Sequence, residues 1–536
     1  MANDVYRPLT TLSYAIDYAV WGLNSFGYHL TNIILHSANA ILVCVLLFLL
    51  SGNFFVAFFG SLIFAAHPAQ TEVVAWISGR SSVLFLFFYL ASLILYIKFS
   101  REKRRALYLS SLFLFALSLF SKEMSITLPL VIILYDIHFP SKDGLKNRIL
   151  RYIPYFALCV FYVALRIVLV KKIGQFEGWG SPYFIFLTMI NVVADYIRIL
   201  VFPIKLCAVG YPIPITVSIK EPRVIASIAT LLVILASVPV LFKRNRPASF
   251  AILWFFITLL PVLNIIPIKA LEAERFLYLP SIGFCLLVAY AASLLGEKIV
   301  KFGTGKAALI MVLAGTLILG YSLKTISRAE DWKEEVVISN KTALASPDSA
   351  WALTALGANL MERKNYAAAL APLEKAVALC EGYELARNAL GECYLRLGRN
   401  EEAVIQFKEV LKMNPVAAKT RNFLGVAYAS LKNYNDAQKQ FTAALAKDPE
   451  FLNAHLNLGR LYEMMAETSK ALKQYEKASV VTKDPVDKAV IYIRMGDAYL
   501  KMNSSEEARS YYQKAKDIAP ASDSIRTLTE TKLKEV

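Results

Sequence analysis

The sequence is poor in charged residues and in cysteine. Charged residues make up 18% of the 536 positions, against about 25% in an ordinary soluble protein. A single soluble domain is therefore excluded. The six cysteines are scattered and form no metal-type pair, which excludes a cysteine zinc site, and we expect free thiols. They are Cys44, Cys159, Cys207, Cys285, Cys380 and Cys393.

The short motifs of soluble enzymes are also missing. The sequence holds no glycine-rich phosphate loop, no His-Glu-x-x-His pair and no serine elbow, so no soluble-enzyme chemistry is indicated. Met1 to Thr11 holds no apolar run ahead of a cleavage site, and we expect the run from Tyr28 to act as the insertion signal. Acidic residues are fewer than basic ones, and the formal charge is +17. Much of this charge lies in short loops, where it sets topology, so we expect no nucleic-acid partner.

What the sequence has in abundance is long apolar runs, all within its first 326 residues. Residues 6–27 predict an amphipathic helix along the membrane surface, with Asp17 interrupting its apolar face. Ten membrane spans follow, and residues 327–536 are charged and alanine-rich. We therefore predict an all-α chain with a polytopic membrane domain over 1–326, a connecting segment over 327–348 and a second domain over 349–536. The predicted spans are 28–50, 54–66, 82–97, 107–120, 124–139, 152–170, 223–242, 248–266, 277–295 and 307–326.

Charge in the loops predicts which side of the membrane each loop faces. Segment 183–203 carries Asp195 and Arg198, and we expect a helix that rests at the membrane face or re-enters it without crossing. All four basic loops then fall on the cytoplasmic side, as the positive-inside rule requires. The polar segments and the C-terminal domain share the other face. The basic loops are Lys98–Arg105, Lys142–Arg151, Lys243–Arg246 and Lys298–Lys306, and the opposite segments are 67–80, 121–123, 171–222 and 269–275.

The C-terminal region is an internal repeat. Gly357, Gly391, Gly425 and Gly459 follow one another at intervals of 34 residues (391 − 357, 425 − 391, 459 − 425), and Gly496 continues the series. Alanines, an aromatic residue and a proline recur after each glycine. Small residues let two antiparallel helices approach, and proline ends the second helix. This period resembles tetratricopeptide repeats, and it predicts an α-solenoid of about five repeats that binds a partner or acceptor protein.

Five stretches together resemble the family whose members have many transmembrane spans followed by tetratricopeptide repeats. These C-class glycosyltransferases include the animal O-mannosyltransferases that act on cadherins. The resemblance covers nearly the whole chain. It rests on YRPLTTLSYAIDY (6–18), FGYHLTNIILH (26–36), FAAHPAQTEVVAWISGR (64–80), LFSKEMSITLPLVIILYD (119–136) and AERFLYLPSIG (273–283).

This resemblance implies transfer of a mannose-like sugar from a polyprenyl-phosphate donor to an acceptor on the non-cytoplasmic face. It leaves the acceptor, the cofactors and any requirement for a divalent metal open. Inverting transfer needs a carboxylate to take the hydroxyl proton and cations to hold the phosphate. We expect Arg275 to bind the phosphate, helped by Arg80 or Lys122.

The expected catalytic residues are Glu72, Glu123 and His67. We expect the two carboxylates to orient the sugar or the acceptor, and His67 to hydrogen-bond the donor or to position Glu72. Each candidate also has a purely structural interpretation. His67 before Pro68 fits a helix cap, and Lys122 with Glu123 fits an interfacial ion pair. Arg80 fits a cation reaching toward headgroups. Arg275, which follows Glu272 and Glu274, fits a surface charge cluster.

The sequence departs from the family pattern at its start. Relatives usually carry one more span and an outer acidic loop before the Tyr-Arg-Pro-Leu motif, which begins here at Tyr6, and Asp4 is the sole acidic residue ahead of it. We expect either a longer reading frame or a chain that is not competent alone. The alternative function is a non-catalytic membrane scaffold for envelope assembly, and a third is a transporter or accessory subunit for lipid-linked sugars. The expected location is the cell inner or plasma membrane, with the repeats outside the cytoplasm.

Overall fold

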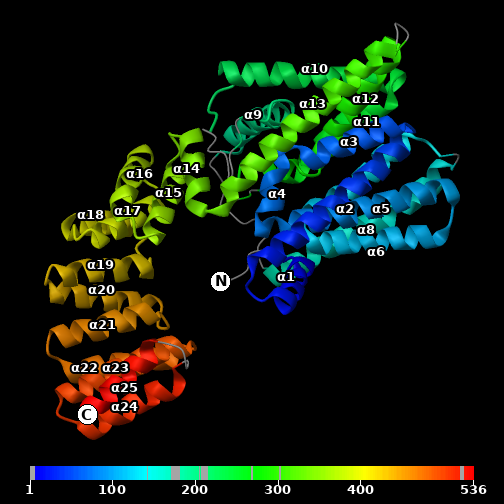
Figure 1. The fold of residues 1–536 in the computed structure, drawn as a ribbon. Coiled ribbons are helices and arrows are strands. Elements are labelled where there is room, and N and C mark those ends of the chain that lie inside the picture. The colour runs from blue at the N-terminus through cyan, green and yellow to red at the C-terminus, as the bar shows by residue number, and fades with distance from the viewer. Residues whose placement is uncertain are drawn as a thin grey trace. The chain divides into compact units, whose positions relative to one another are not determined.

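A computed structural model describes residues 6–141, 143–170, 181–204, 206, 215–266, 268, 270–300, 304–519 and 524–536, with backbone only for 297–300, 304–310 and 524. The residues outside the described ranges include Asp4, Lys142, Lys269, part of the Lys298–Lys306 loop, residues 171–180 and 205, and residues 207–214 with Cys207. The predicted all-α class is confirmed, because the described residues form helices and no strand (Figure 1). The chain divides into two compact units, Met1–Ser346 and Pro347–Val536.

The first unit is a bundle of apolar helices in which α2 packs on α3 and α5, α5 on α6, and α11 on α12 (Figure 1). Its core is rich in buried aromatic side chains such as Trp254, Tyr89 and Tyr155. The elements are α1 (Pro8–Trp21), α2 (Ser25–Ser51), α3 (Phe54–Ala66), η1 (Pro68–Gln70), α4 (Thr71–Ala75), η2 (Ile77–Gly79), α5 (Arg80–Glu102), α6 (Arg105–Ser121), η3 (Glu123–Thr127), α7 (Leu128–His138), α8 (Leu145–Val170), α9 (Pro182–Val201), α10 (Pro222–Arg244), α11 (Arg246–Leu259), η4 (Leu260–Val262), η5 (Glu274–Leu277), α12 (Ser281–Val300), α13 (Thr304–Ala329), η6 (Glu330–Lys333) and α14 (Glu335–Ala345).

Local sequence explains how α2 ends and α3 begins. Gly52 adopts a left-handed conformation with φ of 67° and closes α2 with a backbone bond to Phe48, the usual role of glycine at a helix end. Asn53 then caps α3, because its side chain accepts hydrogen bonds from the backbone N–H groups of Phe55 and Val56. Because Gly52 ends α2 and Asn53 begins α3, the two helices turn back on each other and pack side by side.

Several helices of this unit are long and apolar enough to cross a membrane. By length and composition five helices of the described residues qualify, namely α2, the stretch Ile77–Glu102, α8, α9 and α10, and a sixth if the bent pair Phe54–Ala66 and Pro68–Ala75 is one span. Shorter apolar helices cover Arg105–Ser121, Arg246–Val262 and Ser281–Gly296. Each of the ten predicted spans contains an α-helix, but three differ from it in their bounds. Span 124–139 begins in η3, span 248–266 continues past α11, and span 277–295 begins before α12. The count of ten crossings and the resting position of α9 stay predictions.

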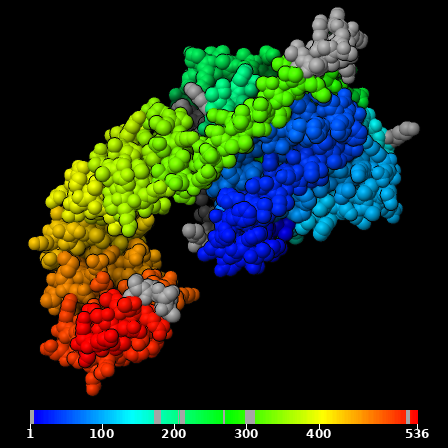
Figure 2. Space-filling model, in the orientation of Figure 1, coloured from blue at the N-terminus to red at the C-terminus, as the bar shows by residue number. Residues whose placement is uncertain are grey.

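The second unit is a stack of helix pairs in which each helix packs against the next along the chain (Figure 1). In Figure 2 these residues follow one another from yellow through orange to red. Each repeat glycine packs directly under a side chain of the next helix. A Cβ built on Gly391 would lie 2.6 Å from the ring of Phe407, and one on Gly459 would lie 2.5 Å from the ring of Tyr475. The helices are α15 (Ala350–Glu362), α16 (Tyr366–Leu379), α17 (Glu384–Arg396), α18 (Asn400–Met413), α19 (Ala418–Ser430), α20 (Tyr434–Lys447), α21 (Leu452–Met464), α22 (Thr468–Val481), α23 (Pro485–Lys501), α24 (Ser505–Ile518) and α25 (Ser524–Glu535).

Candidate functional site

The polar segment 67–80 folds into three short helices, η1, α4 and η2, between α3 and α5. His67 caps η1, because its Nδ1 accepts the backbone N–H of Ala69 at 3.2 Å. Its Nε2 then donates to the carbonyl of Leu200 on α9 at 3.0 Å. Gly79 is required by close packing, since a Cβ there would lie 2.1 Å from the carbonyl oxygen of Val73. His67 therefore fastens this segment to α9.

Glu72 on α4 binds Arg275 twice. Its Oε2 accepts the backbone N–H of Arg275 at 2.8 Å, and its Oε1 accepts Nη1 at 2.5 Å. The Glu72 side chain is 1% exposed and that of Arg275 is 22% exposed. The guanidinium also lies over the rings of Trp76 and Phe276, at 5.7 and 5.1 Å from their centroids. The carboxylate thus fixes the orientation of an arginine that keeps one accessible edge.

Glu123 is held by Arg7 in a two-pronged ion pair. The Arg7 Nε lies 3.0 Å from Oε2, and Nη2 lies 2.6 Å from Oε1. Burial opposes ionisation of Glu123, but the charge and hydrogen bonds of Arg7 outweigh it and lower the pKa of this carboxyl to about 2. Such a carboxylate has little affinity for a proton near neutral pH.

Lys122 lies close to the ionised groups of Glu72, Arg275, Arg7 and Glu123. Among the described residues it forms no direct ion pair with a carboxylate. Its Nζ donates to Ser82 Oγ at 2.7 Å and lies over the ring of Phe85, and the residue is 4% exposed. Burial, followed by the charge of Arg7, lowers the pKa of Lys122 to about 7. Glu123, Arg275 and Glu72 also act on it electrostatically. The structure therefore brings together four predicted site residues, Glu72, Lys122, Glu123 and Arg275, and adds Arg7, which was not predicted from the sequence.

Arg80 lies next to this cluster but faces another way. Its guanidinium is fully buried, with Nη2 at 2.6 Å from Asp17 Oδ2 and 2.9 Å from the carbonyl of Tyr28, and its Nε bonds to Asn32. A buried ion pair with these extra hydrogen bonds leaves no face for a ligand. Arg80 joins α1 and α2 to the start of α5. The Asp17 that interrupts the apolar face of α1 is explained by this contact.

Two acidic residues near Arg275, Glu272 and Glu274, are buried and do not form a surface charge cluster. Glu274 is buried and paired with Arg328, whose Nη2 lies 2.7 and 2.8 Å from its two oxygens. Glu272 is 1% exposed, and its Oε1 has no hydrogen-bond partner among the described residues. Burial, followed by the charge of Asp195, raises the pKa of Glu272 well above its usual value, and Arg198 and Arg223 oppose this. The sequence placed Glu272 beside Arg275, but it gave no sign of burial.

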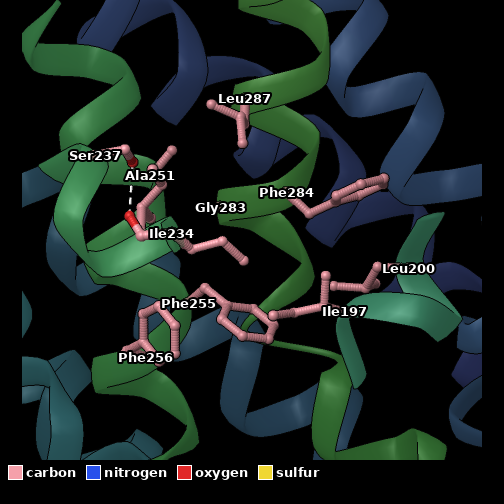
Figure 3. Close-up of a pocket in the computed structure, with 11 residues that line it drawn as sticks. Ile197, Leu200, Ile234, Ser237, Ala251, Phe255, Phe256, Gly283, Phe284 and Leu287 are labelled. Atoms are coloured by element: carbon pink, nitrogen blue, oxygen red, sulfur yellow. Dashed lines mark hydrogen bonds between the residues drawn. The ribbon is translucent and has the colours of Figure 1, made fainter. Parts of the chain in front are cut away.

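A group of three or more His, Cys, Asp or Glu side chains that could hold a metal does not occur among the described residues. Cys380 and Cys393, which belong to neighbouring repeats, are free thiols. An apolar pocket lies between α9, α10, α11 and α12, with a free volume of about 170 Å³ (Figure 3).

Apolar helices of spanning length followed by a helical solenoid define a membrane protein with a repeat domain. Residues 348–415, 424–488 and 489–522 each match a family model described as tetratricopeptide repeat. The prediction of tetratricopeptide repeats is confirmed.

The curated relatives are protein O-mannosyl-transferases. F38B6.6 of Caenorhabditis elegans is 31% identical over 367 residues, which is 64% of this chain and 49% of its own length. TMTC3 of Homo sapiens is 26% identical over 441 residues, covering 74% of this chain and 47% of the relative, and TMTC4 of Homo sapiens is 26% identical over 427 residues, covering 68% and 56%. The chain spans about half the length of these relatives. The family resemblance stated from the sequence motifs is confirmed.

Proposed function

We propose that this chain is a membrane glycosyltransferase that moves a mannose-like sugar from a polyprenyl-phosphate donor to a protein hydroxyl on the non-cytoplasmic face. Two lines support the proposal. The relatives carry the name protein O-mannosyl-transferase. The cluster around Lys122 holds three cationic groups, Arg7, Lys122 and Arg275, against two carboxylates.

That unbalanced positive charge is the observation that carries the proposal. An anion is stabilised where cations are held in place and partly removed from water. Arg275 keeps an edge of its guanidinium free to bind phosphate oxygens, because only Nη1 is bound by a described side chain. Lys122 has a pKa of about 7, and the negative charge of the donor's phosphodiester favours its protonated form.

In the transfer step the acceptor oxygen forms a bond to the anomeric carbon, and the bond from that carbon to the phosphate oxygen breaks. The hydroxyl proton of the acceptor passes to an oxygen of the departing phosphate. The polyprenyl phosphate leaves with the bonding electrons, and its developing charge falls on Arg275 and Lys122. Glu72 and Glu123 are bound by Arg275 and Arg7, so we assign them to positioning these cations. His67 likewise positions the segment that holds Glu72, through its bonds to Ala69 and Leu200.

The solenoid has no part in this chemistry, and we propose that it recruits the acceptor or a partner protein, as helical repeats do through their extended surfaces. This proposal rests on the repeat architecture alone, and it does not depend on the proposed donor site.

The test is sugar transfer from mannosyl-phosphoryl polyprenol to an acceptor protein by the purified full chain in lipid nanodiscs. Arg275→Lys keeps the charge and removes the planar fork, and it should lower transfer by about 10- to 1,000-fold, the range for loss of one charge-stabilising donor. Lys412→Ala, on the exposed surface of α18, is the matched control and should transfer normally. Unchanged transfer by Arg275→Lys and by Lys122→Met together would refute the site. No transfer by the wild-type chain with any donor would favour the scaffold function.

A further inference from the structure

An exposed tryptophan lies directly beside Arg275. The guanidinium carbon of Arg275 is 5.7 Å from the centre of the Trp76 ring, and 37% of Trp76 is exposed. Trp76 ends the short helix α4, whose earlier residues Glu72 and Val73 are buried. Because the Arg275 side chain is itself 22% exposed, an aromatic surface and an accessible cation lie side by side at this site.

The backbone of Trp76 is fixed by three hydrogen bonds. Its carbonyl accepts Nδ2 of Asn32 at 3.1 Å and the N–H of Gly79 at 2.8 Å, and its own N–H donates to the carbonyl of Glu72 at 3.3 Å. The indole N–H forms no hydrogen bond among the described residues. The fold therefore holds this ring in place, and the ring offers an apolar face with one hydrogen-bond donor at its edge.

A second tryptophan, Trp332 in η6, supports the first from within the same unit. The two ring centroids are 6.3 Å apart, and the ring planes are inclined by 31°. η6 follows α13, which runs beside α4 (Figure 1). On α13, Arg328 pairs with Glu274, the residue before Arg275. The segment that carries Trp332 is thus tied to the segment that carries Arg275, and the rings and the cation keep a fixed relation.

An aromatic face next to an arginine matches the two parts of a sugar phosphate. The C–H groups of a hexose ring are apolar and slightly positive, and they are attracted to the negative face of an aromatic ring. The phosphate carries the negative charge that a guanidinium binds. A single oxygen joins the anomeric carbon to the phosphorus, so the groups that bind the two parts have to be neighbours, as Trp76 and Arg275 are.

We propose that Trp76 is the sugar platform of the donor site, on which the transferred hexose lies with its C–H face against the indole ring while its phosphate binds Arg275. The inference rests on the proposed function and names the sugar subsite. The indole N–H is available to a hydroxyl of the same sugar. A stacked ring fixes where the anomeric carbon lies, and small misplacements of a reacting atom cost large factors in rate. Trp332 positions Trp76 and does not touch the sugar.

Trp21 provides the comparison that separates a sugar platform from a membrane anchor. Tryptophans are enriched at membrane surfaces, where their rings lie at the level of the headgroups. Trp21 ends α1 and is 38% exposed, almost the same fraction as Trp76. Its ring packs on Phe26, and among the described residues no cation lies over it. An effect of headgroup contact alone should therefore be shared by the two tryptophans, whereas an effect on the sugar should belong to Trp76.

The experiment measures binding of two phosphodiesters of the short isoprenoid alcohol citronellol to the full chain in nanodiscs, with empty nanodiscs as the blank. One phosphate is joined to mannose at the anomeric carbon, and the other carries a methyl group and has the same charge. The wild type should prefer the mannosyl diester by at least about fivefold, a factor within the range of one aromatic contact. Trp76→Leu should abolish this preference without weakening the methyl diester. Trp76→Phe should keep most of it, and Trp21→Leu should keep all of it.

The remaining outcomes overturn the proposal or separate it from the proposed function. Equal weakening of both diesters by Trp76→Leu would mean that the ring only orients Arg275, and equal loss of preference in Trp21→Leu would assign the effect to the membrane surface. A wild type without preference would also refute the platform. A preference that depends on Trp76 in a chain that transfers no sugar would refute the proposed function and leave the platform standing. Normal transfer by Trp76→Leu, with an unchanged KM for the donor, would refute the platform alone.

Discussion

The two units hold their charges in opposite ways. In the solenoid, ion pairs such as Arg399 with Glu402 join residues three apart on one helix, and both side chains are substantially exposed. In the first unit, Glu72 and Arg275 are 203 residues apart and the carboxylate is buried. Exposed pairs contribute little to stability, whereas removing one partner of a buried pair strands a charge. The exposed pairs keep the helix surface polar. The buried pairs hold together segments that are far apart in the sequence.

The largest expected difference between the units comes from breaking one pair of each kind. Arg275→Ala leaves the Glu72 carboxylate buried without its partner and should lower the free energy of unfolding by about 3–5 kcal/mol. Arg399→Ala should leave it almost unchanged, because water solvates both partners of that pair. Thermal unfolding of the full chain in detergent, followed by circular dichroism, measures both.

A double variant separates the stranded charge from lost packing. Glu72→Gln with Arg275→Gln removes both charges and should recover most of the stability lost in Arg275→Ala. If the double variant is as unstable as the single one, contact of Arg275 with Trp76 and Phe276 is what matters, and the contrast between the units fails.

A second prediction concerns packing in the solenoid. Gly391→Ala drives a methyl group into the ring of Phe407, 2.6 Å away, and should cost about 1–3 kcal/mol. Gly382→Ala is the matched control, since nothing lies within 4 Å of its added Cβ, and it should change stability by no more than about 0.5 kcal/mol. Equal effects would show that the repeat glycines are not fixed by helix contact.

Lys122 makes the stability of the first unit depend on pH. Its pKa is about 7 in the fold and about 10.4 in the unfolded chain, so between these values the unfolded state binds one more proton. Stability should therefore rise with pH across this window by at most about 1.4 kcal/mol per pH unit. Lys122→Met should lose this slope and be more stable than the wild type at pH 7. A larger slope in the variant would contradict the burial of the amine.

Glu272 should produce the opposite slope at lower pH. Its pKa is raised in the fold, so above the unfolded value of about 4.3 the folded state holds the extra proton and stability falls as pH rises. Glu272→Gln should remove this decline, with little effect at pH 4. Unfolding temperatures of both forms from pH 4 to 8 test it, and parallel curves would mean that Glu272 is ionised in the fold.

The solenoid was predictable because each of its contacts repeats along the chain. The 34-residue glycine spacing placed Gly425 against Phe441 and Gly459 against Tyr475, since both partners belong to one repeat. Bonds of Arg387 to Gln406 and of Arg421 to Gln440 follow the same period. Ten apolar runs were likewise found as helices, because hydropathy is a local property.

The candidate site was predictable only in its residue types. Arg80 and Arg275 each follow a polar segment and precede an apolar run. No feature of the neighbouring sequence distinguishes the two arginines. The fold encloses Arg80 with Asp17 and leaves Arg275 partly exposed beside Lys122. Arg7 escaped notice because its partner, Glu123, lies 116 residues away.

By itself, the sequence determined that this protein is helical, that its first 326 residues are apolar and that its last third is a repeat, because composition and period act over short distances. Only the tertiary structure decided that Arg80 is enclosed while Arg275 stays partly exposed, and that Glu72 and Glu123 are held by arginines. The physical reason is that burial and charge pairing depend on segments brought together by packing, and no local pattern encodes those partners.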